Sequence, residues 1–69
     1  MQIVLNGEKT EQKEGISIAG LLSQLGIGLE RVAVEVNLDI VPKAGYDTHL
    51  LSDGDKIEIV HFVGGGQPE

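Results

Sequence analysis

The chain begins with a pattern of apolar and polar residues that is typical of a β-hairpin. Residues 2–5 are rich in strand-forming side chains, whereas residues 8–13 are almost entirely polar. Between them, Asn6 and Gly7 favour the positive φ angles of a type I′ turn. Because the second segment has little to bury, we expect it to lie at the edge of a sheet.

An amphipathic helix is predicted next. Ser17 is suited to accept a hydrogen bond from a backbone N–H at the start of a helix. The apolar residues after it follow the helical period, which predicts that one face of the helix is buried. These residues are Ile18, Leu21, Leu22 and Leu25. Gly26 then favours the left-handed conformation in which helices commonly end.

Two further strands are predicted in the middle of the chain. Residues 32–36 alternate strictly, with valine at every second position, as in a strand with one buried face. A tight turn then leads into a short strand that Pro42 ends. Residues 43–51 have no clear period, so we expect a loop with one helical turn, in which Tyr46 anchors the core or its rim.

The last predicted strand, residues 56–63, determines which side chains face outward. Ile57 and Ile59 lie on one face of this strand, and Val60 and Phe62 lie on the other. Since a single helix covers only one face of a sheet, Val60 and Phe62 are expected on the open face. Two large apolar side chains there predict a docking surface, unless a loop or the curl of the sheet covers them.

Together these elements predict an α+β fold of the β-grasp, or ubiquitin-like, type. This is one mixed sheet of about four to five strands with one main helix packed on one face. The first strand and the strand after the helix are too far apart for a hairpin, which predicts some parallel pairing. We expect the domain to span residues 1–63 and residues 64–69 to form a flexible tail.

Composition narrows the function classes. The chain has 69 residues, enough for one small domain, and no cysteine, which excludes disulfides and thiolate zinc sites. His49 and His61 are too few for a histidine metal site, so we expect no metal. The net charge of −6 disfavours nucleic acid and reflects either solubility or a basic protein partner. Without a signal-peptide or membrane-span pattern, we expect no membrane association and a cytoplasmic location.

The residues offer little for catalysis, and we therefore expect the chain not to be an enzyme. Asp53 and Asp55 form a carboxylate pair, but in a hydrophilic turn we expect them to hold the turn together. His61 has no obvious nucleophile to serve. No glycine motif precedes a helix, as a phosphate-binding loop would require.

Gly64, Gly65 and Gly66 directly follow the last predicted strand. Glycine loses the most backbone freedom on ordering and contributes no packing, so the triplet does not stabilise a fold. It is either a disordered terminus or a segment without side chains that enters a narrow channel in another protein. Three extended residues would reach about 10 Å into such a channel.

The sequence resembles the ThiS-type sulfur carriers of thiamin biosynthesis over nearly its whole length. The resemblance rests on "MQIVLNG", "AVEVN" before "IVP", "DGD", "IEIVHFVGGG" and the leucines of the predicted helix. It implies that a ThiF-type adenylyltransferase uses ATP and magnesium to adenylate the terminal glycine, which then becomes a thiocarboxylate. A ThiG-type thiazole synthase would draw on that sulfur. The carrier itself would bind no cofactor and would act as a protein co-substrate.

Carried onto this sequence, the resemblance places the reactive carboxyl on Gly66. Gly64, Gly65, Val60 and Phe62 would contact the partner enzymes. The family normally ends at this glycine, but here Gln67, Pro68 and Glu69 follow, and while they are attached the Gly66 carbonyl is an amide. We expect a processing protease to remove them. A cloning remnant, or a protein that has left the sulfur pathway, would also explain them.

Three alternatives share the fold. The small subunit of molybdopterin synthase is a carrier of the same type, although its tail is often preceded by prolines, which are absent from "VHFV". A β-grasp module that only binds its partner would need no terminal chemistry, and fold alone does not exclude it. Conjugation to another protein through an isopeptide bond would share the activation step.

Overall fold

The computed structural model describes residues 1–62. Its elements follow one another as β1 (Gln2–Leu5), β2 (Glu8–Glu11), α1 (Ile18–Gln24), η1 (Leu29–Arg31), β3 (Val32–Val36), β4 (Asp39–Val41), η2 (Lys43–Gly45) and β5 (Lys56–His61), where η marks a short 3₁₀ helix. This order confirms the elements predicted from the sequence. Two strands are shorter than expected: the second ends at Glu11 and the last ends at His61.

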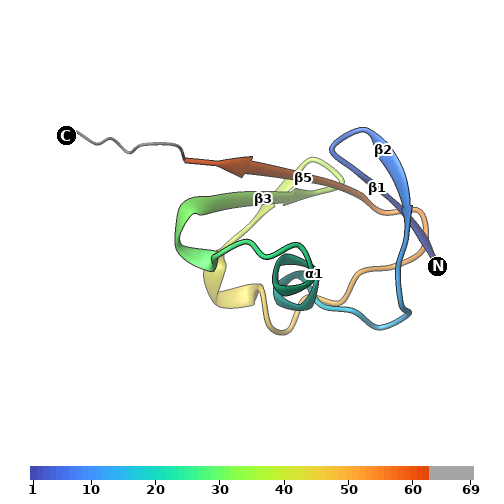
Figure 1. Ribbon diagram of the computed structural model, residues 1–69, viewed down its shortest axis with the longest axis horizontal. Helices are drawn as coiled ribbons and strands as arrows, with labels where there is room; N and C mark the ends of the chain where they lie inside the picture. The colour runs from blue at the N-terminus through green and yellow to red at the C-terminus, as the bar shows by residue number, and fades with distance from the viewer. Residues whose placement is uncertain (63–69) are drawn as a thin grey trace.

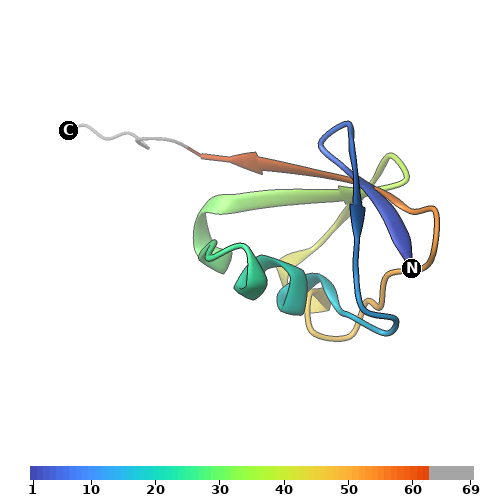
Figure 2. The same ribbon diagram turned by 45° about the vertical axis from the view of Figure 1, so that its right-hand side comes forward.

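The strands form one five-stranded mixed sheet in the order β2-β1-β5-β3-β4 (Figure 1). β1 pairs with β5 in parallel, and the other three pairings are antiparallel. The predicted parallel pairing therefore involves the last strand, while β3, the strand after the helix, does not neighbour β1. Helix α1 lies against one face of the sheet (Figure 2). The fold is the predicted β-grasp.

Both hairpins turn through left-handed backbone conformations. In the β1–β2 turn, Asn6 has φ 49° and Gly7 has φ 86°, as the sequence predicts. In the β3–β4 turn, Asn37 has φ 52° and Leu38 has φ 75°. Leucine rarely adopts this conformation, because its Cβ crowds the backbone. The second turn is thus held in a strained form by the strands that it joins.

The core lies between α1 and the sheet. Ser17 caps the helix, with its Oγ accepting a hydrogen bond from the Gly20 N–H at 3.0 Å. Three helix residues of the predicted stripe are completely buried and pack with the inward-facing residues of the strands. They are Ile18, Leu21 and Leu22. The fourth, Leu25, is 43% exposed, because the helix ends at Gln24 and Leu25 is its C-cap.

The segment between β4 and β5 closes the core beside the helix. Tyr46 is buried there and anchors the core, as predicted. Its carbonyl accepts a hydrogen bond from the Ala19 N–H at 2.9 Å, and the Leu51 N–H donates to the Ile16 carbonyl at 2.9 Å. These bonds join the segment to the first turn of α1 and to the residue before its N-cap. Among the described residues, no helix is long and apolar enough to cross a membrane.

Candidate functional site

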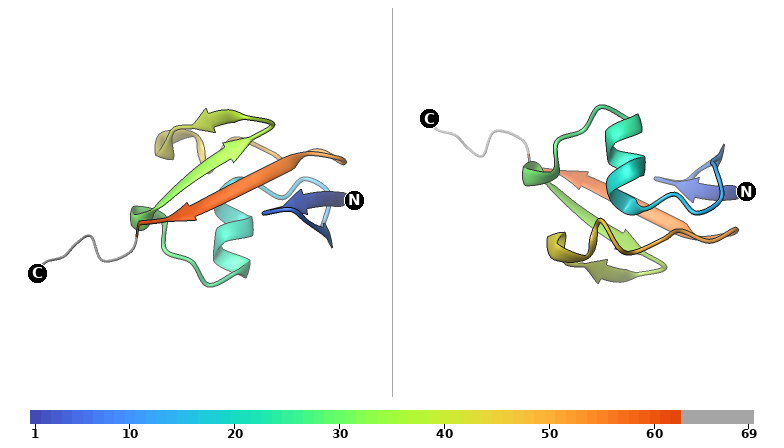
Figure 3. Two further views of the ribbon diagram at one scale, coloured as in Figure 1. Left: turned by 90° about the horizontal axis from the view of Figure 1, so that it is seen from above. Right: turned by 90° about the horizontal axis from the view of Figure 1, so that it is seen from below.

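Strand β5 has one buried and one exposed face. Ile57 and Ile59 are buried against the core, whereas Val60 is 56% exposed and Phe62 is 55% exposed. Figure 3 shows β5 crossing the middle of the sheet, with the helix behind it in the left view and in front of it in the right view. The prediction that Val60 stands on the open face is confirmed. Phe62 lies one residue beyond the end of β5 and is also more than half exposed.

Neighbouring strands extend this apolar surface. In the β3–β5 register Val60 lies opposite Ala33, and Glu58 lies opposite Glu35. In the β3–β4 register Glu35 also lies opposite Ile40, which is 71% exposed. We call these outward-facing residues of β3, β4 and β5, together with Phe62, the open-face cluster. Its members are Ala33, Glu35, Ile40, Glu58, Val60 and Phe62.

The end of β5 is held from both sides. On one side, the Phe62 N–H donates to the Arg31 carbonyl at 2.8 Å. On the other side β1 has already ended at Leu5, and the side chain of Asn6 takes its place. Its Oδ1 accepts a hydrogen bond from the Ile59 N–H at 2.8 Å, and its Nδ2 donates to the Ile59 carbonyl at 3.4 Å. The last strand is therefore fixed almost to its final residue.

The sequence pattern does not predict this second role of Asn6. Asn-Gly predicts a turn, and the signal that could have revealed the contact with β5 is the residue type itself. An Asn at this turn position has an amide that can both donate and accept a hydrogen bond. Whether this amide faces a strand depends on which strand lies beside β1. The local sequence does not reveal that neighbour.

The remaining residues considered as site candidates either follow Phe62 in the sequence or stabilise the fold. Residues 63–69 lie outside the described residues, so the domain boundary and the roles of Gly64, Gly65 and Gly66 stay predictions. Asp53 Oδ1 accepts from the Gln2 N–H at 2.7 Å, and Asp55 Oδ2 accepts from the Ser52 N–H at 2.8 Å. Asp55 holds the turn, as expected, whereas Asp53 ties the turn to the start of β1.

Comparison with known proteins identifies relatives over almost the whole chain. The ThiS family profile matches residues 2–66. A sulfur carrier protein ThiS of Bacillus subtilis is 43% identical over 90% of this chain and 96% of its own length. The crystal structure of a thiamine biosynthesis protein (ThiS) from Geobacter metallireducens covers 96% of this chain and 100% of its own, with 32% identity and a TM-score of 0.83.

Longer proteins contain a similar segment. A thiazole synthase of Paramagnetospirillum magneticum is 45% identical to this chain over all of its 69 residues. The chain spans 21% of the length of that protein, and likewise 21% of a thiazole synthase of Magnetococcus marinus.

Proposed function

Because the chain belongs to the ThiS family of sulfur carriers, we propose that it carries sulfur as a thiocarboxylate on Gly66 for the synthesis of the thiamin thiazole. The observation that supports this most is the position of β5. This strand lies in the middle of the sheet, is held on one side up to Ile59 and on the other up to Phe62, and leads directly into the glycine segment of the sequence. A rigid body thus carries the tail, with exposed apolar side chains beside its root.

The chemistry requires a free carboxylate at Gly66. A carboxylate oxygen attacks the α-phosphorus of ATP, a P–O bond forms, and pyrophosphate leaves with its electron pair. A sulfur nucleophile supplied by a donor then attacks the acyl carbon of the adenylate, and AMP leaves. Removal of Gln67–Glu69 must come first, because an amide carbonyl offers no oxyanion for the first step. A processing protease supplies that step.

In this proposal the chain is a co-substrate of other enzymes. ATP and Mg²⁺ are bound by a ThiF-type adenylyltransferase, and the carrier contributes the acyl group and a surface for docking. Glycines at the end of the tail suit this role, because a side chain there would collide with a narrow passage toward the bound phosphates. The surface for docking comprises Val60 and Phe62, which lie at the root of the tail.

The acceptor of the sulfur is proposed to be a ThiG-type thiazole synthase. The support is the pair of longer relatives named thiazole synthase, each of which includes a segment similar to nearly the whole of this chain. A carrier and an acceptor joined in one polypeptide act on each other at high effective concentration. We infer that this chain meets its acceptor through the same contacts.

The test compares a chain that ends at Gly66 with the full chain. Each is incubated with the adenylyltransferase, ATP and Mg²⁺, and exchange of labelled pyrophosphate into ATP is measured. The shorter chain should support exchange and, with a sulfur donor, gain the mass expected when sulfur replaces one oxygen. A chain ending at Gly66 that carries Gly66→Ala should remain folded and lose exchange. Equal exchange by both chain lengths would refute the role of Gly66.

A further inference from the structure

Two carboxylates face each other near the centre of the open face of the sheet. Glu35 of β3 lies directly opposite Glu58 of β5 in an antiparallel register. Directly opposed residues have Cβ atoms about 4.5–5.5 Å apart, and like charges in such a pair disfavour the folded chain. Within residues 1–62, the only ion pair closer than 4.0 Å joins the Met1 ammonium to Glu11. No described basic group therefore pairs with either carboxylate within 4.0 Å, and Lys56, the outward-facing residue of β5 before Glu58, is the basic side chain that shares this face.

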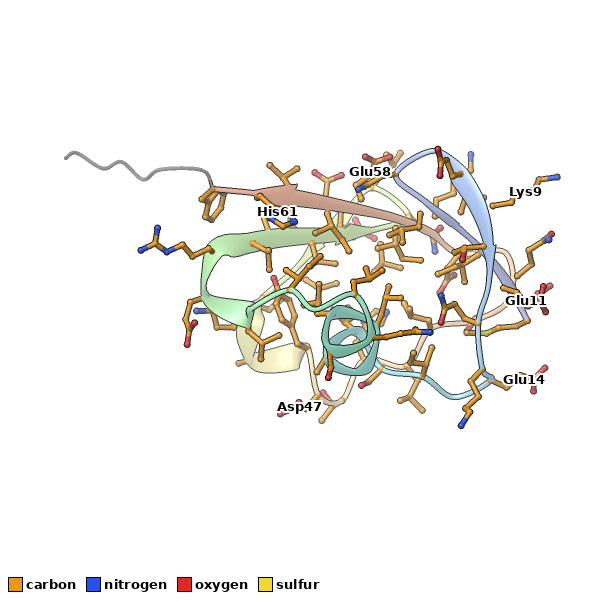
Figure 4. The ribbon with its side chains drawn as sticks, in the orientation of Figure 1. Lys9, Glu11, Glu14, Asp47, Glu58 and His61 are labelled. Atoms are coloured by element: carbon orange, nitrogen blue, oxygen red, sulfur yellow. The ribbon has the colours of Figure 1, made fainter. Side chains whose placement is uncertain are left out.

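Apolar side chains border this acidic pair. Ile40 lies opposite Glu35 on the other side of β3, and Val60 is the next outward-facing residue after Glu58. Phe62 follows one residue beyond the end of β5, and all three apolar side chains are more than half exposed. Figure 4 shows Glu58 on the side of the sheet opposite to the helix, whereas Glu14 and Asp47 lie at the helix side of the molecule.

We propose that the open-face cluster docks a thiazole synthase through a basic side chain, best an arginine, that lies between Glu35 and Glu58. Ile40, Val60 and Phe62 then pack against apolar side chains around that cation. A guanidinium group has donors on two edges and can bind two carboxylates at once. Because Glu35 is already half-buried, docking would exclude water from the pair and strengthen its attraction to the cation. This inference rests on the proposed function.

The net charge of the chain and its similarity to segments of thiazole synthases both favour a thiazole synthase as the docking partner. A net charge of −6 attracts a basic surface, but it does not by itself choose a position on the molecule. The opposed carboxylates of Glu35 and Glu58 do favour one position, because a partner cation between them removes a repulsion that the free chain retains. The longer relatives named thiazole synthase contain a segment similar to this chain, so in those proteins the two parts are joined in one polypeptide.

The experiment measures binding of the full chain to the thiazole synthase of the same organism by isothermal titration calorimetry. The test variant is Glu35→Gln/Glu58→Gln. The matched control is Glu14→Gln/Asp47→Asn, which removes the same number of carboxylates from exposed positions at the helix side. Both variants have the same net charge, so a difference in their affinity reflects the position of the removed carboxylates and not the overall charge of the chain. Thermal unfolding of each free variant shows that binding is compared between folded chains.

We expect the Glu35/Glu58 variant to bind about tenfold more weakly at low salt, and the control to change by less than about threefold. The salt dependence should also fall for the Glu35/Glu58 variant only. In the free chain its melting temperature should stay the same or rise, because a repulsion has been removed. Equal weakening by both variants, an unchanged affinity of the Glu35/Glu58 variant, or no binding of the original chain would each overturn the inference. Adenylation of a chain ending at Gly66 tests the proposed function separately, since it does not involve thiazole synthase.

Discussion

The side chain of Asn6 should contribute a measurable part of the stability of β5. Replacing it in Asn6→Gly keeps the left-handed backbone that φ 49° requires and removes both hydrogen bonds to Ile59. The bond to the Ile59 N–H is short, at 2.8 Å, and the bond to its carbonyl is long, at 3.4 Å. With about 1 kcal/mol for a good intramolecular hydrogen bond, we expect a loss of about 1–2 kcal/mol. Asn6→Ala should lose about 0.5–1 kcal/mol more, because alanine is strained at positive φ.

Urea unfolding followed by far-UV circular dichroism measures this loss, and for a domain of this size about 1 kcal/mol corresponds to about 4–8 °C in melting temperature. Hydrogen exchange of the Ile59 amide gives the local readout and should accelerate more than that of other core amides. Asn37→Gly in the second hairpin is the control, since it should not single out Ile59. If Asn6→Gly stayed within about 0.5 kcal/mol of the original chain, with unchanged exchange at Ile59, the bridging role would be refuted.

Three further substitutions test the packing and the turns by urea unfolding. Ser17→Ala should lower the free energy of unfolding by about 1 kcal/mol, because it removes the N-cap of α1; no change would mean that water caps the helix equally well. Leu38→Gly should raise it by up to about 1 kcal/mol, since Leu38 is 88% exposed and held at φ 75°; a loss would show that the leucine side chain has a stabilising contact. Ile57→Ala should lower it by about 3–4 kcal/mol, because the side chain is completely buried; a loss below about 1 kcal/mol would contradict tight packing at this position.

Local chemistry explains why much of the fold is predictable. Asn6-Gly7 determines a turn, Ser17 determines the start of a helix, and the alternation in residues 32–36 and 56–61 determines which side chains are buried. Each of these signals is contained within a few neighbouring residues. The end of the helix is predictable too, because Gly26 follows the C-cap Leu25 in the left-handed conformation, with φ 73°. Only the exposure of Leu25, which continues the apolar period, differs from the pattern.

Strand order and register come from contacts between distant residues, so the pattern alone did not reveal them. No local sequence signal indicates that β5 inserts between β1 and β3. This insertion creates the parallel pairing of β1 with β5. The exposure of Val60 and Phe62 was predictable from alternation. The opposition of Glu35 and Glu58, and the contact of Asn6 with Ile59, required the register itself.

The parallel pairing of β1 and β5 has a mechanical consequence. β1 lies near the start of the chain and β5 near its other end, so a force that pulls the two termini apart slides these strands past each other. Their hydrogen bonds, including Val4 N–H to the Asp55 carbonyl and Asn6 N–H to the Ile57 carbonyl, are then loaded together and must break together. A domain loaded in this shearing direction resists extraction by an unfolding motor better than one whose terminal strand peels away bond by bond.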